Sequence, residues 1–270
     1  MRCEQVMMTP ERAQKILDES NLANYRTLRR RVVDMYASDM RNGLWQENGV
    51  PICIAENGIL KDGQHRLSAI VKSGVSIPMI VVYDVPADVD IYDTGTARTY
   101  MDILKAKGIF TDSSIVGAAR LILAKNFDPH GYVASKSQVA DLIQKHEEMF
   151  YLASTLIRTH NHKPICRYRS IALATIYLLH NGEDDKMLKE FFGVVNTGFP
   201  QGTHNPRPAI VMRNQLLKAN SSGKDKLFAH MTVRAYMDYK NNISRSRMYG
   251  TSEALDKKFN LFFAEILGEI

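Results

Sequence analysis

The chain has 270 residues, 45% of them hydrophobic, and a net charge of +6. This length suffices for one large domain or two modest domains with real cores. No run of about 18 apolar residues is present, which argues against a membrane-spanning helix, and residues 1–14 lack the apolar core of a secretory signal. Cys3, Cys53 and Cys166 form no paired motif and are typical of reduced thiols. We therefore expect a cytoplasmic protein without a membrane partner.

The positive charge lies in the second half of the chain. Residues 1–150 carry 18 Lys and Arg against 19 Asp and Glu, whereas residues 151–270 carry 17 against 10. A basic half favours a polyanionic partner, for which nucleic acid, and DNA in particular, is the obvious candidate. Plain solubility is the alternative explanation of this surplus.

Two helices are predicted before the first strand. Thr9, Pro10 and Glu11 occur in the order of an N-cap, a first helical residue and a first-turn acid. The second helix is expected from Tyr25 to Asn42. Its arginine-rich start can contact a phosphate backbone, but the aspartates that follow on the same helix favour a solvated face. Trp45, beyond this helix, is expected to pack on the sheet.

A β-hairpin is predicted around residue 57. Asn57 and Gly58 lie between the apolar runs Ile52–Ile54 and Ile59–Leu60. Both turn residues tolerate the positive φ of a type I′ turn, so the two runs are expected to be paired strands.

A second turn signal, Asp62 and Gly63, precedes a helix that is predicted to end at Gly74. After it, Ile77–Val82 has the continuous apolar character of a buried strand. These elements place residues 64–66 in the first turn of a helix that leaves a sheet.

The first turn of this helix is a candidate anion site. Its backbone N–H groups have no intrahelical partner and the helix dipole attracts negative charge. Gly63 and Gln64 lie at the turn, Arg66 can bind a phosphate bidentately, and His65 can donate a hydrogen bond or transfer a proton. Asp62 would then orient one of these side chains or hold a cation. The alternative is an ordinary helix start, with Asp62 as the cap and Arg66 in a surface salt bridge.

The segment DGQHRLSA, residues 62–69, resembles the G-x-x-R box of the ParB/sulfiredoxin superfamily. The preceding ICIAENGIL resembles the strand, turn and strand that lead into that box. The resemblance covers roughly residues 5–105 and is greatest to ParB-like proteins of bacteriophages and bacterial genomes. It implies a ParB/sulfiredoxin-like α/β (α+β) domain with a small mixed sheet and a phosphate-handling pocket, which we place at residues 1–107.

The resemblance also implies that a later loop closes one end of this pocket. Asp93, Thr94 and Arg98 in this loop can hydrogen-bond phosphate or ribose. Asp62 and Asp93 are the candidate ligands of a Mg²⁺ or Mn²⁺ ion, and a nucleoside triphosphate is the candidate cofactor. An ordinary turn, with Arg98 paired to an aspartate, is the alternative.

Residues 108–270 are predicted to form a basic, all-α domain. Asp112 can cap one helix, and Ser135 to Gln138 form a capping box before another. Further helices are expected at about 147–158, 166–181, 184–196, 206–220, 224–241 and 253–267, punctuated by Gly and Pro. His160 and His162 lack Cys or Glu at ligand spacing, which favours a loop over a metal site.

Arginine and tyrosine alternate in this second half, a pairing that holds backbone phosphates and stacks on bases. An ordinary helical surface shows the same composition. The most basic short segment is Ile243–Arg247. The candidates for nucleic-acid contacts are Arg167, Arg169, Arg234, Arg245 and Arg247.

The first functional hypothesis is a phage-type, ParB-like protein that binds nucleotide or DNA phosphate through the DGQHR box. If it acts as a nuclease or NTPase, Asp62 holds the metal, His65 is the acid or base, and Arg66 neutralises developing charge. The helix-turn-helix signature of partition proteins is not evident, which argues against chromosome segregation itself.

Two alternatives come from other functional classes. One is a small-molecule phosphotransferase, with Glu47 or Glu56 as the base. Gln64 stands where sulfiredoxin has its catalytic cysteine, which argues against sulfiredoxin chemistry. The other is a catalytically silent interaction or anti-defence module.

Overall fold

The computed structural model describes residues 1–21, 27–87, 99–106, 108–109, 112–128, 132–158, 168–219, 224–247 and 249–269. The chain forms two compact units, Met1–Arg98 and Thr99–Ile270. The sequence predicted a division after residue 107, but the structure divides the chain before helix α4 (Tyr100–Ala106). Helix α4 packs against helices of the second unit and therefore belongs to it. No helix in the described ranges has the length and apolar character needed to cross a membrane.

The N-terminal unit combines a small mixed sheet with three helices. The strands described form a sheet in the order β1-β4-β2-β3, in which β4 runs antiparallel to β1 and parallel to β2, and β2 runs antiparallel to β3. The elements in chain order are β1 (Arg2–Met8), α1 (Pro10–Ser20), α2 (Arg30–Arg41), β2 (Ile52–Ala55), β3 (Leu60–Asp62), α3 (Gln64–Ser73) and β4 (Ile77–Val85).

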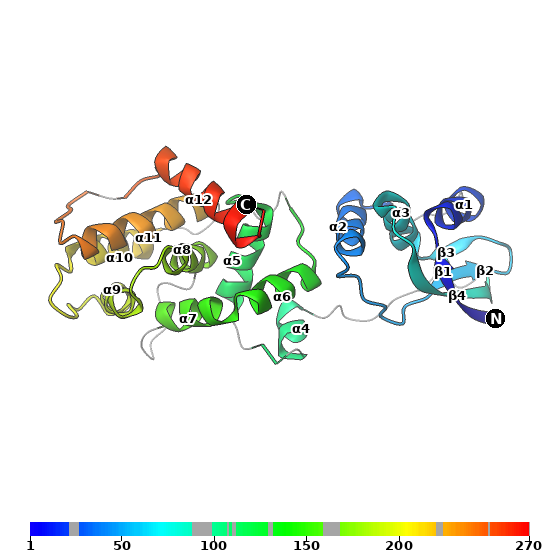
Figure 1. Ribbon diagram of the computed structural model, residues 1–270, viewed down its shortest axis with the longest axis horizontal. Coiled ribbons are helices and arrows are strands. Elements are labelled where there is room, and N and C mark those ends of the chain that lie inside the picture. The colour runs from blue at the N-terminus through cyan, green and yellow to red at the C-terminus, as the bar shows by residue number, and fades with distance from the viewer. Residues whose placement is uncertain are drawn as a thin grey trace. The chain divides into compact units, whose positions relative to one another are not determined.

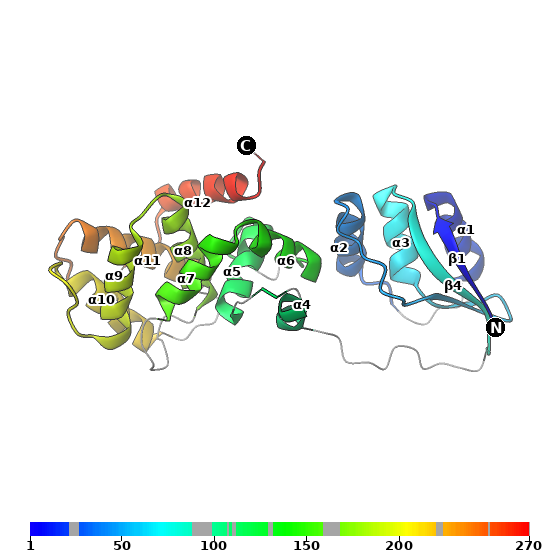
Figure 2. The ribbon, with the colours of Figure 1, turned by 60° about the horizontal axis from the view of Figure 1, so that its bottom comes forward.

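Helices α1, α2 and α3 lie on the same side of this sheet (Figure 1), and α3 contacts both of the others. Ile77, Met79 and Val81 of β4 alternate toward this side and are buried in one cluster with Leu67 of α3. Trp45 packs against the same cluster, as expected. Figure 2 shows β1 and β4 running side by side, as their antiparallel register requires.

Three local details differ from the sequence-based expectations. Strand β1 was not predicted, because its burial is mostly intermediate or exposed and only Met8 is buried. The hairpin between β2 and β3 exists, but its turn is not type I′. Gly58 has φ +79°, whereas Asn57 is not among the residues with positive φ, and its side chain accepts a hydrogen bond from Ile59 N at 3.2 Å. Helix α2 begins at Arg30, later than expected, and residues 22–26 lie outside the described ranges.

The described elements of the second unit are helices, as predicted. They are α4 (Tyr100–Ala106), α5 (Ser113–Ala124), α6 (Lys136–Lys145), α7 (Glu147–Ile157), α8 (Arg169–His180), α9 (Asp185–Thr197), α10 (Arg207–Lys218), α11 (Asp225–Lys240) and α12 (Glu253–Ile266). Helix α8 is at the centre, because residues 170–178 are all buried. It packs against α5, α7 and α11.

The predicted caps of this unit are confirmed. The side chain of Asp112 accepts hydrogen bonds from Ser114 N and Ile115 N at the start of α5. Ser135 and Gln138 form the reciprocal capping box at the start of α6. These signals fix where the helices begin and therefore where the loops between them emerge.

Candidate functional site

The glycine of the DGQHR box lies where β3 meets α3. Gly63 is the residue before α3 and has φ +109°, a conformation that residues with a Cβ rarely adopt. A Cβ at this position would lie 2.9 Å from Cγ1 of Ile52 in the neighbouring strand β2. The glycine is therefore required by the backbone turn and by its close packing on β2.

Arg66 makes contacts within the protein. Its Nη2 donates hydrogen bonds to the carbonyl oxygen of Pro51 and to Oδ2 of Asp62, both at 2.9 Å, and its Nη1 donates to the carbonyl of Val50. Arg66 is only 7% exposed. The guanidinium thus ties the segment before β2 to the end of β3. Because these donors have protein acceptors and the guanidinium is also buried, this geometry does not support the expectation that Arg66 binds a phosphate.

Asp62 is the ionic partner of this arginine, and its side chain is 19% exposed. The option that Asp62 orients Arg66 is therefore the one that the structure adopts. Arg66 engages Oδ2 of Asp62, and Asp93, the other predicted metal ligand, lies outside the described residues, so the metal site stays a prediction. Among the described residues, no group of three or more His, Cys, Asp and Glu side chains is arranged to hold a metal.

His65 also has a structural contact. Its Nε2 accepts a hydrogen bond from the backbone N–H of Arg29 at 3.0 Å. Because Nε2 must supply a lone pair, the imidazole is neutral with its proton on Nδ1. Arg29 precedes α2 and its own side chain makes no cap hydrogen bond. His65 therefore joins the start of α2 to α3, which differs from the expected role as acid or base.

Of the remaining residues of the predicted pocket, the structure describes Gln64 but not the later loop. Gln64 is buried, with 4% exposure. Asp93, Thr94 and Arg98, which were expected to close the pocket, lie outside the described residues. Cys53 faces Asp62 across β2 and β3. Burial, followed by the charge of Asp62, raises the pKa of the Cys53 thiol and disfavours a nucleophilic thiolate.

In the helical unit, Arg169 is committed to an ion pair. Its guanidinium binds both carboxylate oxygens of Asp225, at 2.7 and 3.1 Å. Its aliphatic part packs on Gly117, where an added Cβ would lie 2.5 Å from Cβ of Arg169. Arg169 thus links α5, α8 and α11, and its predicted contact with nucleic acid stays a prediction. Arg167 lies outside the described residues.

The other predicted arginines gather around the segment 241–252 that joins α11 to α12. Arg245 binds the Asp238 carboxylate and lies over the Tyr249 ring, with 5.1 Å between its Cζ and the ring centroid. Tyr249 also donates from its hydroxyl to Asp238 at 3.1 Å. Arg234 donates to the carbonyl oxygen of Gly250 at 3.1 Å.

Arg207, which was not among the predicted contacts, extends this group. Its Nε donates to the carbonyl oxygen of Arg245 at 3.3 Å, and Arg247 is exposed two residues further along. The segment is held in place by Gln215, which makes two hydrogen bonds to the backbone of Tyr249, at 2.7 and 3.0 Å. We define the arginine cluster as Arg207, Arg234, Arg245 and Arg247.

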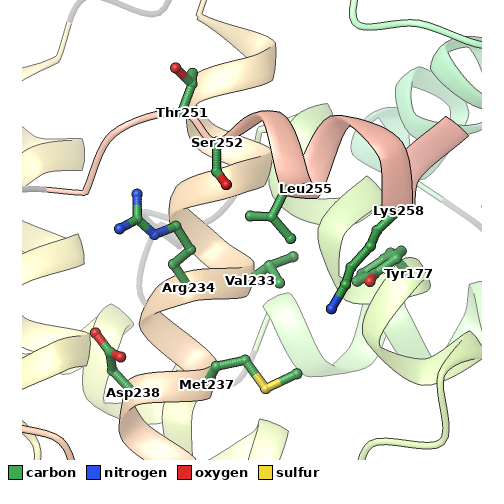
Figure 3. A pocket seen from close by; sticks show the side chains of 9 residues that line it. All are labelled: Tyr177, Val233, Arg234, Met237, Asp238, Thr251, Ser252, Leu255 and Lys258. Carbon is green, nitrogen blue, oxygen red and sulfur yellow. The ribbon is translucent and has the colours of Figure 1, made fainter.

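A cavity of about 400 Å³ lies beside the cluster, between α11 and α12 (Figure 3). Arg234 lines it together with Lys258 of α12, and its apolar lining includes Met237 and Leu255. Sequence analysis missed Lys258 and Met237 as functional candidates. Met237 and Lys258 lie on consecutive helices, and the sequence does not specify the angle at which these two helices pack. It therefore could not show that the two side chains line one cavity.

Comparison of the chain with protein-family models, with curated proteins and with solved structures finds no match.

Proposed function

We propose that the protein binds nucleic acid, and specifically the phosphate backbone of DNA, through the arginine cluster of its helical unit. The observation that carries this proposal is the charge around the segment 241–252. Four guanidinium groups gather there, and Asp238 is the one carboxylate that pairs with them in the part of the chain that the structure describes. A surface with this excess of positive charge is matched by a row of phosphates.

The balance of charge in the two units supports the same partner. Residues 99–270 carry 23 Lys and Arg against 16 Asp and Glu, whereas residues 1–98 carry 12 against 13. The whole positive surplus of the chain thus belongs to the helical unit. Arginine also suits this role because its planar guanidinium presents several donors to phosphate oxygens.

The DGQHR box, which forms the corner between β3 and α3, has a structural role in this proposal and does not bind DNA. The contacts of Arg66, Asp62 and His65 hold β2, β3, α2 and α3 together, so the box contributes shape to the N-terminal unit. The resemblance of this box to ParB-like proteins is consistent with a DNA-associated protein of phage or bacterial type. Nuclease, NTPase and phosphotransferase activities gain no support from the described residues of the corner, and we propose DNA binding without assigning a reaction.

The test is the salt dependence of DNA binding, measured by fluorescence anisotropy with a labelled duplex. A variant carrying Arg207→Gln and Arg247→Gln removes two cluster cations that have no ion pair among the described residues. The plot of log K against log salt is expected to lose about 0.9 in slope for each phosphate contact removed. The double variant should therefore have a slope smaller by about 1.8 and bind the duplex more weakly.

A matched control removes the same charge elsewhere in the helical unit. Lys105→Gln in α4 and Lys136→Gln in α6 lie on helices away from α10 and α11 (Figure 1). This control is expected to keep the wild-type slope. Equal slopes and affinities for the cluster variant and the control would overturn the proposal.

A further inference from the structure

The cavity between α11 and α12 combines an apolar floor with a charged rim. Val233 and Met237 of α11, Leu255 of α12 and the ring of Tyr177 of α8 form the apolar part, and Val233 and Leu255 are buried in the core of the unit. The volume of about 400 Å³ is within the range of sites that hold one small organic group. The floor is therefore suited to the flat, weakly polar face of a ring system.

The rim of the cavity carries two cations, Arg234 and Lys258, and one carboxylate, that of Asp238. Lys258 has no ion pair among the described residues, and Arg234 donates to a backbone carbonyl, that of Gly250. Asp238 also lines the cavity, but its carboxylate is already bound by Arg245. An anion is thus the complement of this rim.

The two cations are separated by the apolar floor. Figure 3 shows Arg234 on one side of the cavity and Lys258 on the other, with Val233 and Leu255 between them. Two cations beside an apolar surface suit one nucleotide of a strand, whose sugar is flanked by two backbone phosphates and carries the base to the side. Ser252, which lines the cavity and makes no side-chain cap hydrogen bond at the start of α12, adds a hydroxyl for the edge of a base.

We propose that this cavity receives one unpaired base of a DNA strand whose backbone is bound by the arginine cluster. The inference rests on the proposed function, because Arg234 belongs to both the cluster and the rim of the cavity. A base inside a duplex is stacked and paired, and it reaches such a cavity only after extrusion from the helix. The protein therefore prefers single-stranded DNA to a duplex of the same sequence.

The experiment uses the full chain and an oligonucleotide that carries one 2-aminopurine, either single-stranded or annealed to its complement. Wild-type protein is expected to bind the single strand about tenfold or more tightly than the duplex, because extrusion is costly. The emission of 2-aminopurine should rise on binding, since the base leaves its stacked neighbours in the DNA for a floor that is largely aliphatic.

Two variants address the cavity, and each has a matched control. Lys258→Met removes a rim cation, whereas Lys257→Met removes the same charge from the adjacent exposed position of α12. Met237→Glu places a carboxylate on the floor, whereas Met187→Glu makes the same change at a partly buried methionine of α9 that does not line the cavity. Each cavity variant should weaken single-strand binding several-fold more than its control, and Met237→Glu should also abolish the rise in emission.

The outcomes separate this inference from the proposed function. Duplex binding that depends on Arg207 and Arg247, together with equal affinity for the single strand, would overturn the inference alone. Equal effects of Lys258→Met and Lys257→Met, or an unchanged emission signal in Met237→Glu, would also overturn it. Absence of binding to either form of DNA would overturn the proposed function itself.

Discussion

Replacement of Arg66 by alanine tests whether the DGQHR arginine holds the fold or holds a ligand. The substitution removes the hydrogen bonds to the carbonyl oxygens of Val50 and Pro51 and leaves the Asp62 carboxylate without its ionic partner. Breaking a buried ion pair by removing one partner costs about 3–5 kcal/mol. Because the Asp62 side chain retains 19% exposure, we expect the lower end of this range, about 3 kcal/mol.

The single tryptophan of the chain allows this loss to be measured in the correct unit. Trp45 packs against the core of the N-terminal unit and edge-on against Tyr36, with ring centroids 5.2 Å apart. Its emission during urea denaturation therefore follows the unfolding of that unit. With an m-value of about 1.5 kcal/mol/M, Arg66→Ala should lower the urea midpoint by about 2 M. Arg66→Lys keeps the charge but loses the forked geometry, and should cost about 1.5 kcal/mol.

A second arginine in the same unit provides the control. Arg31→Ala changes an exposed position of α2 and should shift the free energy of unfolding by no more than about 0.5 kcal/mol. If Arg66→Ala unfolds at the same urea concentration as Arg31→Ala and instead loses affinity for nucleotide or DNA, the structural role of Arg66 is refuted and a ligand role is restored.

Two further predictions concern the backbone at the corner and a buried histidine. Gly63→Ala should destabilise the N-terminal unit by about 3 kcal/mol, because the positive φ and a close contact with β2 coincide at this residue. Gly74→Ala, where an added Cβ would meet open space, should cost only about 1 kcal/mol. Urea denaturation followed by Trp45 emission compares the two variants. Burial lowers the pKa of His230, so the unfolded chain binds more protons than the folded chain below about pH 6.5. Thermal unfolding should show stability falling as the pH drops through that value, and a His230→Phe variant with the same pH dependence would contradict this assignment.

Local signals in the sequence were sufficient to locate most elements. Ser135 and Gln138 begin α6 as their capping chemistry requires, and Gly63 and Gly74 bound α3 at the expected residues. Such signals operate within one helical turn, where steric and hydrogen-bonding rules are independent of the rest of the chain. Strand β1 has no comparable signal, because its pairing depends on β4, about 75 residues further along the chain.

The partners of the candidate site residues were less accessible to prediction. The position of Arg66 at the start of α3 followed from the turn before it, but its acceptors at Val50 and Pro51 depend on the path of the chain before β2. Arg169 similarly finds its carboxylate 56 residues away, at Asp225. The composition shows how many arginines the chain has, but only the tertiary structure shows which of them form ion pairs within the protein.

Strand β4 has a consequence for the synthesis of the N-terminal unit. Both β1 and β2 form their ladders with β4, so neither arrangement is complete until the ribosome has released residues 77–85. During translation, β1 is made before β4 and has no strand to pair with until β4 is released. A shortened chain that lacks residues 2–8 would leave the outer edge of β4 unpaired. β1 is itself an edge of the described sheet, but it carries the charged Arg2 and Glu4, so it leaves an edge less prone to intermolecular pairing than the more apolar β4 would be.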